Sequence, residues 1–405
     1  MRKSYFFAIF LQMSIFFRTF VCLFCADVKM HSSIEERLLL PAVFLLLAVL
    51  PVRAQYAGSG SATFAFLDLP VSSRQNALGG ENISIRDGEL SSAFANPALL
   101  GSLTHNILQL GYAYYGTNHF GSVMYGFAFG NHGAQMSRGG IKAPDASALP
   151  RNGAFSGGAD NFIAVGVHYL DYGSMPYALS DGTRTGVSFG ARDILLEAAY
   201  ARQLGPMFTI GVALKPIMSF YESYSSFALG ADIGGHFQMK DSTLQIGIAL
   251  KNIGWQLKGF YSDESGQKLE MLPINLELGI NYRVKHAPLR FSLTIHNLQR
   301  WDLGYSRLNE TEEVKPVGWF DMMMRHTIWA IDIVPKSEKF YFTLSYNHRR
   351  RQEFYLQDQR SLAGFAAGVG VRIKMVRLGF AMSQMSKQNF TYQASFALDV
   401  NSLMK

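Results

Sequence analysis

Strand-like alternation of apolar and polar residues runs through most of this chain. The clearest example is the segment 289–296, which reads Leu-Arg-Phe-Ser-Leu-Thr-Ile-His, and the segments 208–214, 340–346 and 390–398 repeat the pattern. Successive side chains of a β-strand point to opposite faces, so each segment has one apolar face and one polar face. A soluble β-sandwich turns the apolar face inward, whereas a transmembrane barrel turns it toward lipid.

Composition favours the barrel over the sandwich. Charged residues make up 17% of the 405 residues, below the roughly 25% that is typical of soluble domains, while 13% are aromatic and 38 are glycine. Few charges with many aromatics and glycines are typical of a closed barrel that has aromatic girdles and tight turns. The formal net charge is +7 without a basic stripe, which gives no reason to predict nucleic-acid binding.

Connection lengths point the same way. We predict fourteen strands and exclude a fifteenth segment, 134–143, because it alternates worst and bacterial barrels normally have an even number of strands. The fourteen ranges are 105–116, 119–130, 161–172, 192–204, 206–219, 225–239, 242–253, 271–285, 288–299, 325–335, 338–349, 361–374, 375–387 and 390–400. Counted back from the carboxyl end, short turns alternate with longer connections at 173–191, 254–270, 300–324 and 349–360. Short periplasmic turns and long outer loops indicate an all-β, transmembrane antiparallel β-barrel of about fourteen strands.

The first 104 residues divide into a leader and a plug. Residues 1–54 form the leader, in which a short apolar stretch suits a secretory signal and not a membrane helix. We predict that Met30 is the true start and 30–54 the signal peptide; the alternative is an unusually long natural leader. Residues 55–104 alternate poorly and contain short helical turns. We expect them to plug the outer-membrane barrel formed by 105–405.

Several motifs resemble the PorV/PorQ family of outer-membrane proteins, which belongs to the type IX secretion system. They are Asn96-Pro97-Ala98, Tyr172-Gly173, Tyr-Ala-Arg-Gln-Leu at 200–204 and Leu-Lys-Asn-Ile-Gly at 250–254. The stretches 66–80 and 346–354 are similar to the PorQ branch in particular, and the resemblance covers about residues 60 to 400. It implies a fourteen-stranded, FadL-like barrel in a Gram-negative cell outer membrane, with Asn96, Pro97 and Ala98 as a plug motif.

The same resemblance implies a non-enzymatic role in protein secretion. Family members act in an attachment complex with a PorU-like sortase, PorV and a PorZ-like surface protein, and this complex anchors secreted cargo to lipopolysaccharide. The main hypothesis is therefore a barrel that tethers the PorZ-like partner. The alternative is a FadL-like channel for hydrophobic small molecules. The inward faces assigned from sequence, such as Thr391, Gln393, Ser395 and Asp399, are polar and argue against an apolar route.

The candidate binding residues lie on the predicted outer side, and no catalytic, cofactor or metal site is predicted, because the histidines lack ligand spacing. Arg349, Arg350 and Arg351 could pair with lipopolysaccharide phosphates or a partner, since guanidinium groups bind oxyanions, or could be ordinary barrel rim. Aromatic residues of the outer loops could anchor a partner or form the interface belt. They are Trp255, Phe260, Tyr261, Trp301, Tyr305, Trp319 and Phe320.

Overall fold

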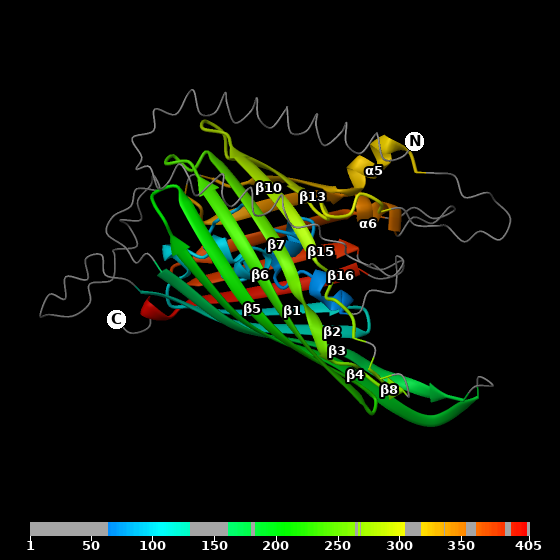
Figure 1. The fold of residues 1–405 in the computed structure, drawn as a ribbon. Coiled ribbons are helices and arrows are strands. Elements are labelled where there is room, and N and C mark those ends of the chain that lie inside the picture. The colour runs from blue at the N-terminus through cyan, green and yellow to red at the C-terminus, as the bar shows by residue number, and fades with distance from the viewer. Residues whose placement is uncertain are drawn as a thin grey trace, which may run out of the picture. The chain divides into compact units, whose positions relative to one another are not determined.

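Fourteen strands close into one antiparallel barrel in the computed structural model (Figure 1). The structure describes residues 64–129, 161–179, 183–263, 266–267, 269–303, 317–335, 337–353, 362–384 and 390–402. The strands are β1 Ile107–Tyr115, β2 Asn118–Phe129, β3 Asn161–Ala178, β4 Arg184–Gln203, β5 Phe208–Tyr221, β6 Tyr224–Gln238, β7 Leu244–Lys258, β10 Asn275–Arg283, β11 Leu289–Ile295, β12 Thr327–Ile333, β13 Phe340–Asn347, β14 Phe365–Ile373, β15 Val376–Gln384 and β16 Phe390–Asp399. Pairing of β1 with β16 closes the barrel.

The sequence prediction of the strands is confirmed, since each of the fourteen predicted ranges contains or overlaps one barrel strand. The excluded segment 134–143 and the predicted leader 1–54, with Met30, lie outside the described residues. With both chain ends periplasmic, as in bacterial barrels, the β3–β4, β7–β10, β11–β12 and β13–β14 connections lie at the outer end. One periplasmic connection, 130–160 between β2 and β3, is long and also lies outside the described residues.

The prediction of an outer loop at 173–191 is wrong. The strands β3 and β4 continue through most of it as a hairpin, in which Ser174 pairs with Gly190 and Pro176 with Ser188. This hairpin extends past the neighbouring strands at the lower right of Figure 1. Gly173 has a positive φ of 75°, and the ladder shifts register beside it. Because both faces of the extension are largely exposed, no apolar period marks it in the sequence.

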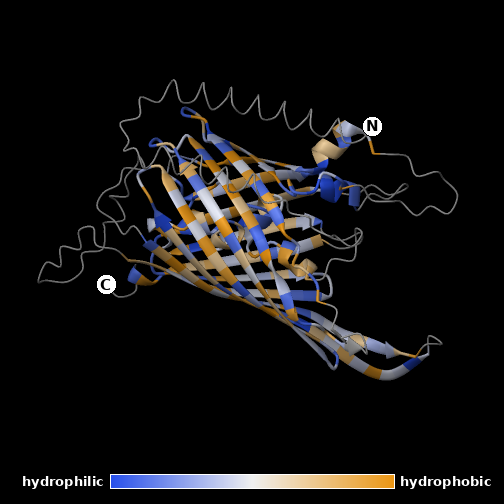
Figure 2. Cartoon of the chain, viewed as in Figure 1, coloured by the Kyte–Doolittle hydropathy of each residue, from blue (hydrophilic) through white to orange (hydrophobic). Residues whose placement is uncertain are grey.

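The outer surface of the barrel is apolar at alternate positions. On β14, Phe365, Val369 and Val371 are exposed, while Ala366 and Gly368 face the interior, where a Cβ atom at Gly368 would meet Ala77. Figure 2 shows hydrophobic and hydrophilic residues alternating along the strands. Apolar side chains exposed over a whole closed surface require an apolar solvent. The barrel is therefore a membrane-spanning one.

Residues 64–104 lie inside the barrel, where they form the predicted plug (Figure 1). The segment folds into short helices, and nearly all of its residues are buried. Its elements are η1 Ala65–Asp68, α3 Ser73–Ala77, α4 Ser92–Ala95, η2 Pro97–Leu99 and η3 Ser102–Thr104. Ser72 caps α3 by accepting a hydrogen bond from the Gln75 amide, a usual way to satisfy a helix amino terminus.

The remaining elements lie mainly at the outer end. They are β8 Ser262–Asp263 and β9 Gly266–Gln267, which form a small ribbon between β7 and β10, with α5 Trp319–Arg325 and α6 His348–Glu353; the turn η5 Val400–Ser402 follows β16. The helix α5 precedes β12, and α6 follows β13 directly. None of the helices in the described ranges is long and apolar enough to span a membrane.

Candidate functional site

The predicted plug motif contacts the inner wall at a place where two strands carry glycines and therefore no side chains. Asn96 accepts a hydrogen bond from the Ala98 amide, with Pro97 as the first residue of η2, an arrangement that satisfies the helix start. Gly211 of β5 and Gly234 of β6 are direct register partners beneath this turn. A Cβ atom at Gly211 would stand 2.5 Å from the Pro97 carbonyl carbon, and one at Gly234 would overlap Asn96 Oδ1. Two facing glycines therefore let the plug backbone touch the sheet.

A second glycine pair repeats this design. Gly247 of β7 and Gly279 of β10 are register partners, and a Cβ atom at Gly247 would overlap the Ile83 carbonyl oxygen. Asn96 joins the two glycine pairs, because its Nδ2 donates to the carbonyl oxygens of Ile83 at 2.8 Å and Gly235 at 3.3 Å. The plug therefore packs directly against four neighbouring strands, β5, β6, β7 and β10.

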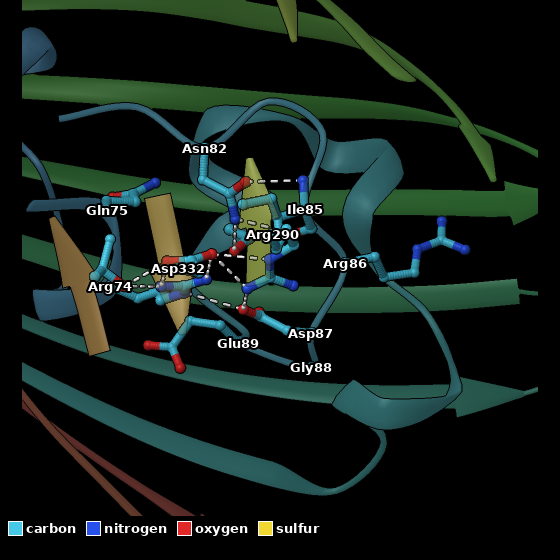
Figure 3. Close-up of polar contacts among 12 residues, drawn as sticks. Arg74, Gln75, Asn82, Ile85, Arg86, Asp87, Gly88, Glu89, Arg290 and Asp332 are labelled. Atoms are coloured by element: carbon cyan, nitrogen blue, oxygen red, sulfur yellow. Dashed lines mark hydrogen bonds and ion pairs between the residues drawn. The ribbon is translucent and has the colours of Figure 1, made fainter. Parts of the chain in front are cut away.

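A buried ion network fixes the plug to the next two strands of the wall, β11 and β12 (Figure 3). Arg74 donates from Nη1 and Nη2 to the two Asp332 carboxylate oxygens at 3.1 and 2.9 Å. Arg290 Nε donates to the same carboxylate at 2.8 Å, and Asp87 of the plug accepts from Arg74 Nε at 3.0 Å. Thr343 Oγ1 donates to Asp332 Oδ1 at 2.5 Å. Asp332 therefore holds two guanidinium groups, one from the plug and one from the wall.

Further buried charges connect the plug with other strands. Lys251 of β7 donates to both carboxylate oxygens of Glu81 at 3.1 and 3.0 Å. Lys215 of β5 forms an ion pair with Asp232 and places its ammonium 4.1 Å from the centre of the Phe94 ring. Buried charges need such partners, because an unpaired charge in a low-dielectric interior is costly.

Burial also shifts the pKa of plug side chains. Arg86 Nη2 donates to the Ala98 carbonyl oxygen, and burial lowers the pKa of its guanidinium to about 10. Glu89 accepts a hydrogen bond from Gln109 at 2.5 Å, and burial, with the nearby charge of Asp87, raises the pKa of its carboxyl. Within the described residues, no three histidine, cysteine, aspartate or glutamate side chains gather as a metal site would require.

The lumen has an apolar side, which the sequence analysis did not predict. In the outer half, plug residues pack against the inner faces of β1 to β6 in a cluster of Phe64, Phe66, Leu67, Val71, Phe94, Ala113, Phe120, Leu170, Leu195, Ile217, Ala228 and Leu272. In the periplasmic half, a second cluster joins Leu90, Ala93, Leu100, Ile107, Met124, Phe162, Ala164, Ala199, Ala201, Ala213 and Ala397. The expectation of polar inward faces holds for Thr391 and Gln393 of β16, whereas the inner faces of β1 to β6 combine the apolar residues of these clusters with buried polar residues such as His168, Glu197 and Lys215. In segment 162–170 both faces are apolar, so alternation could not separate them.

The three predicted arginines lie on α6 and point in different directions. Arg349 Nε donates to Glu353 Oε1 at 2.7 Å. Arg350 reaches the plug, since a Cβ atom at Gly80 would overlap its guanidinium, and its backbone amide donates to Asn347 Oδ1 at 3.1 Å. Arg351 lies against Gly364. The helix therefore directs to different sides the three arginines that the sequence predicts to form one site.

The predicted outer aromatics fall into two groups. Trp319 and Phe320 of α5 are 60% and 64% exposed, and Trp255 and Tyr261 are exposed as well. Two others stack on neighbouring rings: Trp301, itself 45% exposed, lies on His326 with ring centres 5.1 Å apart, and the half-buried Phe260 lies on Tyr221 at 5.0 Å. Tyr305 lies outside the described residues.

One ion cluster joins α5 to α6. Asp321 accepts hydrogen bonds from His348 Nε2 at 2.7 Å and from Arg325 Nε at 2.9 Å. Partial burial acts to raise the pKa of Asp321, but these two hydrogen bonds together hold it below its ordinary value. The carboxylate therefore stays ionised and links the two outer helices.

The fold and its lipid-facing belt define an outer-membrane β-barrel protein with an interior plug. No family model and no curated protein matches this chain, so the resemblance to the PorV/PorQ family stays a prediction. Among solved structures, the chain is similar to the Pseudomonas putida toluene transporter TodX, with a TM-score of 0.47 and 10% identity over 82% of this chain and 98% of that one. It is also similar to a Pseudomonas aeruginosa FadL homologue (0.41; 9%; 82% and 98%) and to the CymD monoaromatic hydrocarbon channel (0.43; 11%; 81% and 96%).

Proposed function

We propose that this barrel admits small hydrophobic molecules along the apolar side of its lumen. The observation that carries this proposal is the pair of apolar clusters, one along β1 to β6 in the outer half and one along β1 to β5 and β16 in the periplasmic half. Transmembrane barrels usually have polar interiors, so an apolar lumen side is a specific feature of this one. It offers a hydrophobic solute apolar contacts in both halves of the lumen.

The two sides of the plug are held differently, and this difference supports passage on one side. The β10 to β13 side holds the plug through the ion network of Arg74, Asp332 and Arg290. The β1 to β4 side packs against Phe66, Phe94 and their neighbours. Apolar contacts are non-directional, so a hydrophobic solute can replace them at little cost. The ion network keeps the plug attached meanwhile.

Uptake of labelled toluene, a solute named for the TodX transporter, tests the proposal. Cells with the barrel should take it up faster than cells without it, and Leu195→Asn should slow this uptake about tenfold, because an inserted amide removes roughly the transfer energy of one buried leucine. Leu196→Asn is the matched control: Leu196 follows Leu195 on β4 but faces outward. Heat-modifiable gel migration verifies folding. Equal uptake with and without the barrel would reject the proposal.

A second candidate function, tethering of a surface protein, is favoured by the exposed outer aromatics. Adjacent large aromatic side chains such as Trp319 and Phe320 are typical anchors of protein interfaces, and their helix lies outside the lipid-facing strands. In this hypothesis the partner is a PorZ-like protein of a type IX attachment complex, with a PorU-like sortase, PorV and lipopolysaccharide-anchored cargo nearby.

The tether hypothesis predicts that Trp319→Ala with Phe320→Ala reduces recovery of the surface protein at least tenfold. The measurement is affinity purification of the tagged barrel from detergent-solubilised outer membranes. Trp329→Ala is the control, because Trp329 is a comparably exposed aromatic residue on the lipid-facing side of β12. Loss of the partner with both variants, or with neither, would count against α5 as the anchor.

A further inference from the structure

A pocket of about 210 Å³ with a mixed polar and apolar lining lies at the outer mouth of the lumen, above the plug. The pocket differs from the apolar clusters, and a binding site in it would be additional to the proposed function. The plug forms its floor, and the wall contributes residues that follow β11 and β13. Its polar lining includes Glu81, His296, Asn297, Asn347 and Arg350.

His296 lines this pocket and carries an unpartnered N–H group. Its side chain is 4% exposed. Nδ1 accepts a hydrogen bond from Asn297 Nδ2 at 2.6 Å, so the proton of the neutral ring resides on Nε2. No described residue accepts a hydrogen bond from Nε2. An unsatisfied buried donor costs about 1–3 kcal/mol, which indicates that an acceptor from outside the chain occupies this position.

The cations around His296 keep it a neutral donor. Burial lowers the pKa of its ring well below the ordinary value, and the nearby charges of Arg349, His326, Arg350 and Lys251 lower it further. The positive surroundings of Nε2 therefore favour an acceptor that carries negative charge.

The carboxylates of the pocket are mostly neutralised within the protein. Lys251 donates hydrogen bonds to both carboxylate oxygens of Glu81, and Arg349 donates one to Glu353. The third carboxylate, Asp68, is exposed at the mouth and is well solvated.

Arg350 is the second arginine of the pocket lining, beside Arg349. No described residue accepts a hydrogen bond from its guanidinium, and only its backbone amide is bonded, to Asn347 Oδ1. Burial lowers the pKa of its guanidinium, while the nearby charges of Glu353 and Glu81 act to raise it. Arginine nonetheless stays protonated in proteins, so its fork is available for an oxyanion.

We propose that this pocket binds a small oxyanion, a phosphate or carboxylate group, between the Nε2–H of His296 and the guanidinium of Arg350. The group can belong to a free solute or to the phosphate of a lipid headgroup at the outer surface. The volume holds several groups the size of a water molecule, each of which takes about 30 Å³ in the liquid.

Equilibrium dialysis of the purified barrel in non-ionic detergent against radiolabelled inorganic phosphate tests this site. Saturable binding of one phosphate per barrel is expected, with competition by acetate but not by glycerol. Arg350→Gln and His296→Leu should each weaken binding at least tenfold, whereas Arg351→Gln, on the same helix but outside the pocket lining, should not change it. Heat-modifiable gel migration confirms that each variant is folded, and His296→Gln, which keeps an N–H donor, should recover part of the affinity.

Two results would overturn the proposal: absence of saturable phosphate binding to the folded wild-type protein, or unchanged binding in both Arg350→Gln and His296→Leu. A further arm adds short-chain phosphatidylglycerol to the dialysis. Displacement of the bound phosphate assigns the site to lipid headgroups, and retention assigns it to free anions; either result supports an oxyanion site.

Discussion

Replacing Asp332 by alanine is expected to lower the free energy of unfolding by about 3–5 kcal/mol, because removal of one partner leaves buried charges uncompensated. The Asp332 carboxylate faces two guanidinium groups, Arg74 at 2.9 Å and Arg290 at 2.8 Å. Asp87 contacts both arginines but cannot replace the bidentate geometry that Asp332 gives Arg74. Urea unfolding of the barrel in detergent micelles, followed by tryptophan fluorescence, measures the effect.

The control for this prediction is Glu338→Ala. Glu338 also pairs with an arginine, Arg283, but its side chain is half exposed, and such surface pairs contribute about 0–1 kcal/mol. Equal losses for the two variants would show that the network around Asp332 does not hold the plug.

Replacing Gly234 by valine is expected to cost about 2–4 kcal/mol, the sum of overpacking and the loss of one hydrogen bond between plug and wall. The new side chain would occupy the position of Asn96 Oδ1 and push the plug turn away from β6. Asn96 would then lose the Gly235 carbonyl oxygen. The same unfolding measurement applies, and protease digestion should cut the plug faster.

Gly121→Val is the matched control for this substitution. Gly121 lies on β2, and a Cβ atom there meets nothing within 4 Å. Neither glycine has a positive φ, so backbone strain is the same in both and only the contact with the plug differs. If the two valine variants were equally stable, the close contact of the plug with Gly211 and Gly234 would not contribute to stability.

Alternation predicted the strands well because a membrane forces every wall strand to expose apolar side chains on one face. It placed Arg290 inward correctly, as the burial of that residue confirms. It could not predict that Arg290 meets Arg74 through Asp332, because these contacts join residues far apart in the chain. Such pairs appear only after the barrel has closed around the plug.

The outer arginines show a second limit of sequence patterns. The sequence predicts that Arg349, Arg350 and Arg351 form a single basic run on the outer side of the barrel. They form part of a helix instead, in which successive side chains are spread around the axis. Arg350 therefore turns to the lumen and approaches His296, which is distant in sequence. The unpartnered Nε2 of His296 had no signal in the sequence beyond its inward position.

The facing glycines of the wall also bear on how this barrel assembles. Paired side chains across neighbouring strands normally stabilise a hairpin, and glycines at those positions weaken it. At Gly211 with Gly234, and at Gly247 with Gly279, the plug supplies the missing contacts. The hairpins β5–β6 and β7–β10 are thus incomplete folding units on their own. Deleting the plug is therefore not equivalent to opening a pore: it removes a template on which four strands acquire their stability.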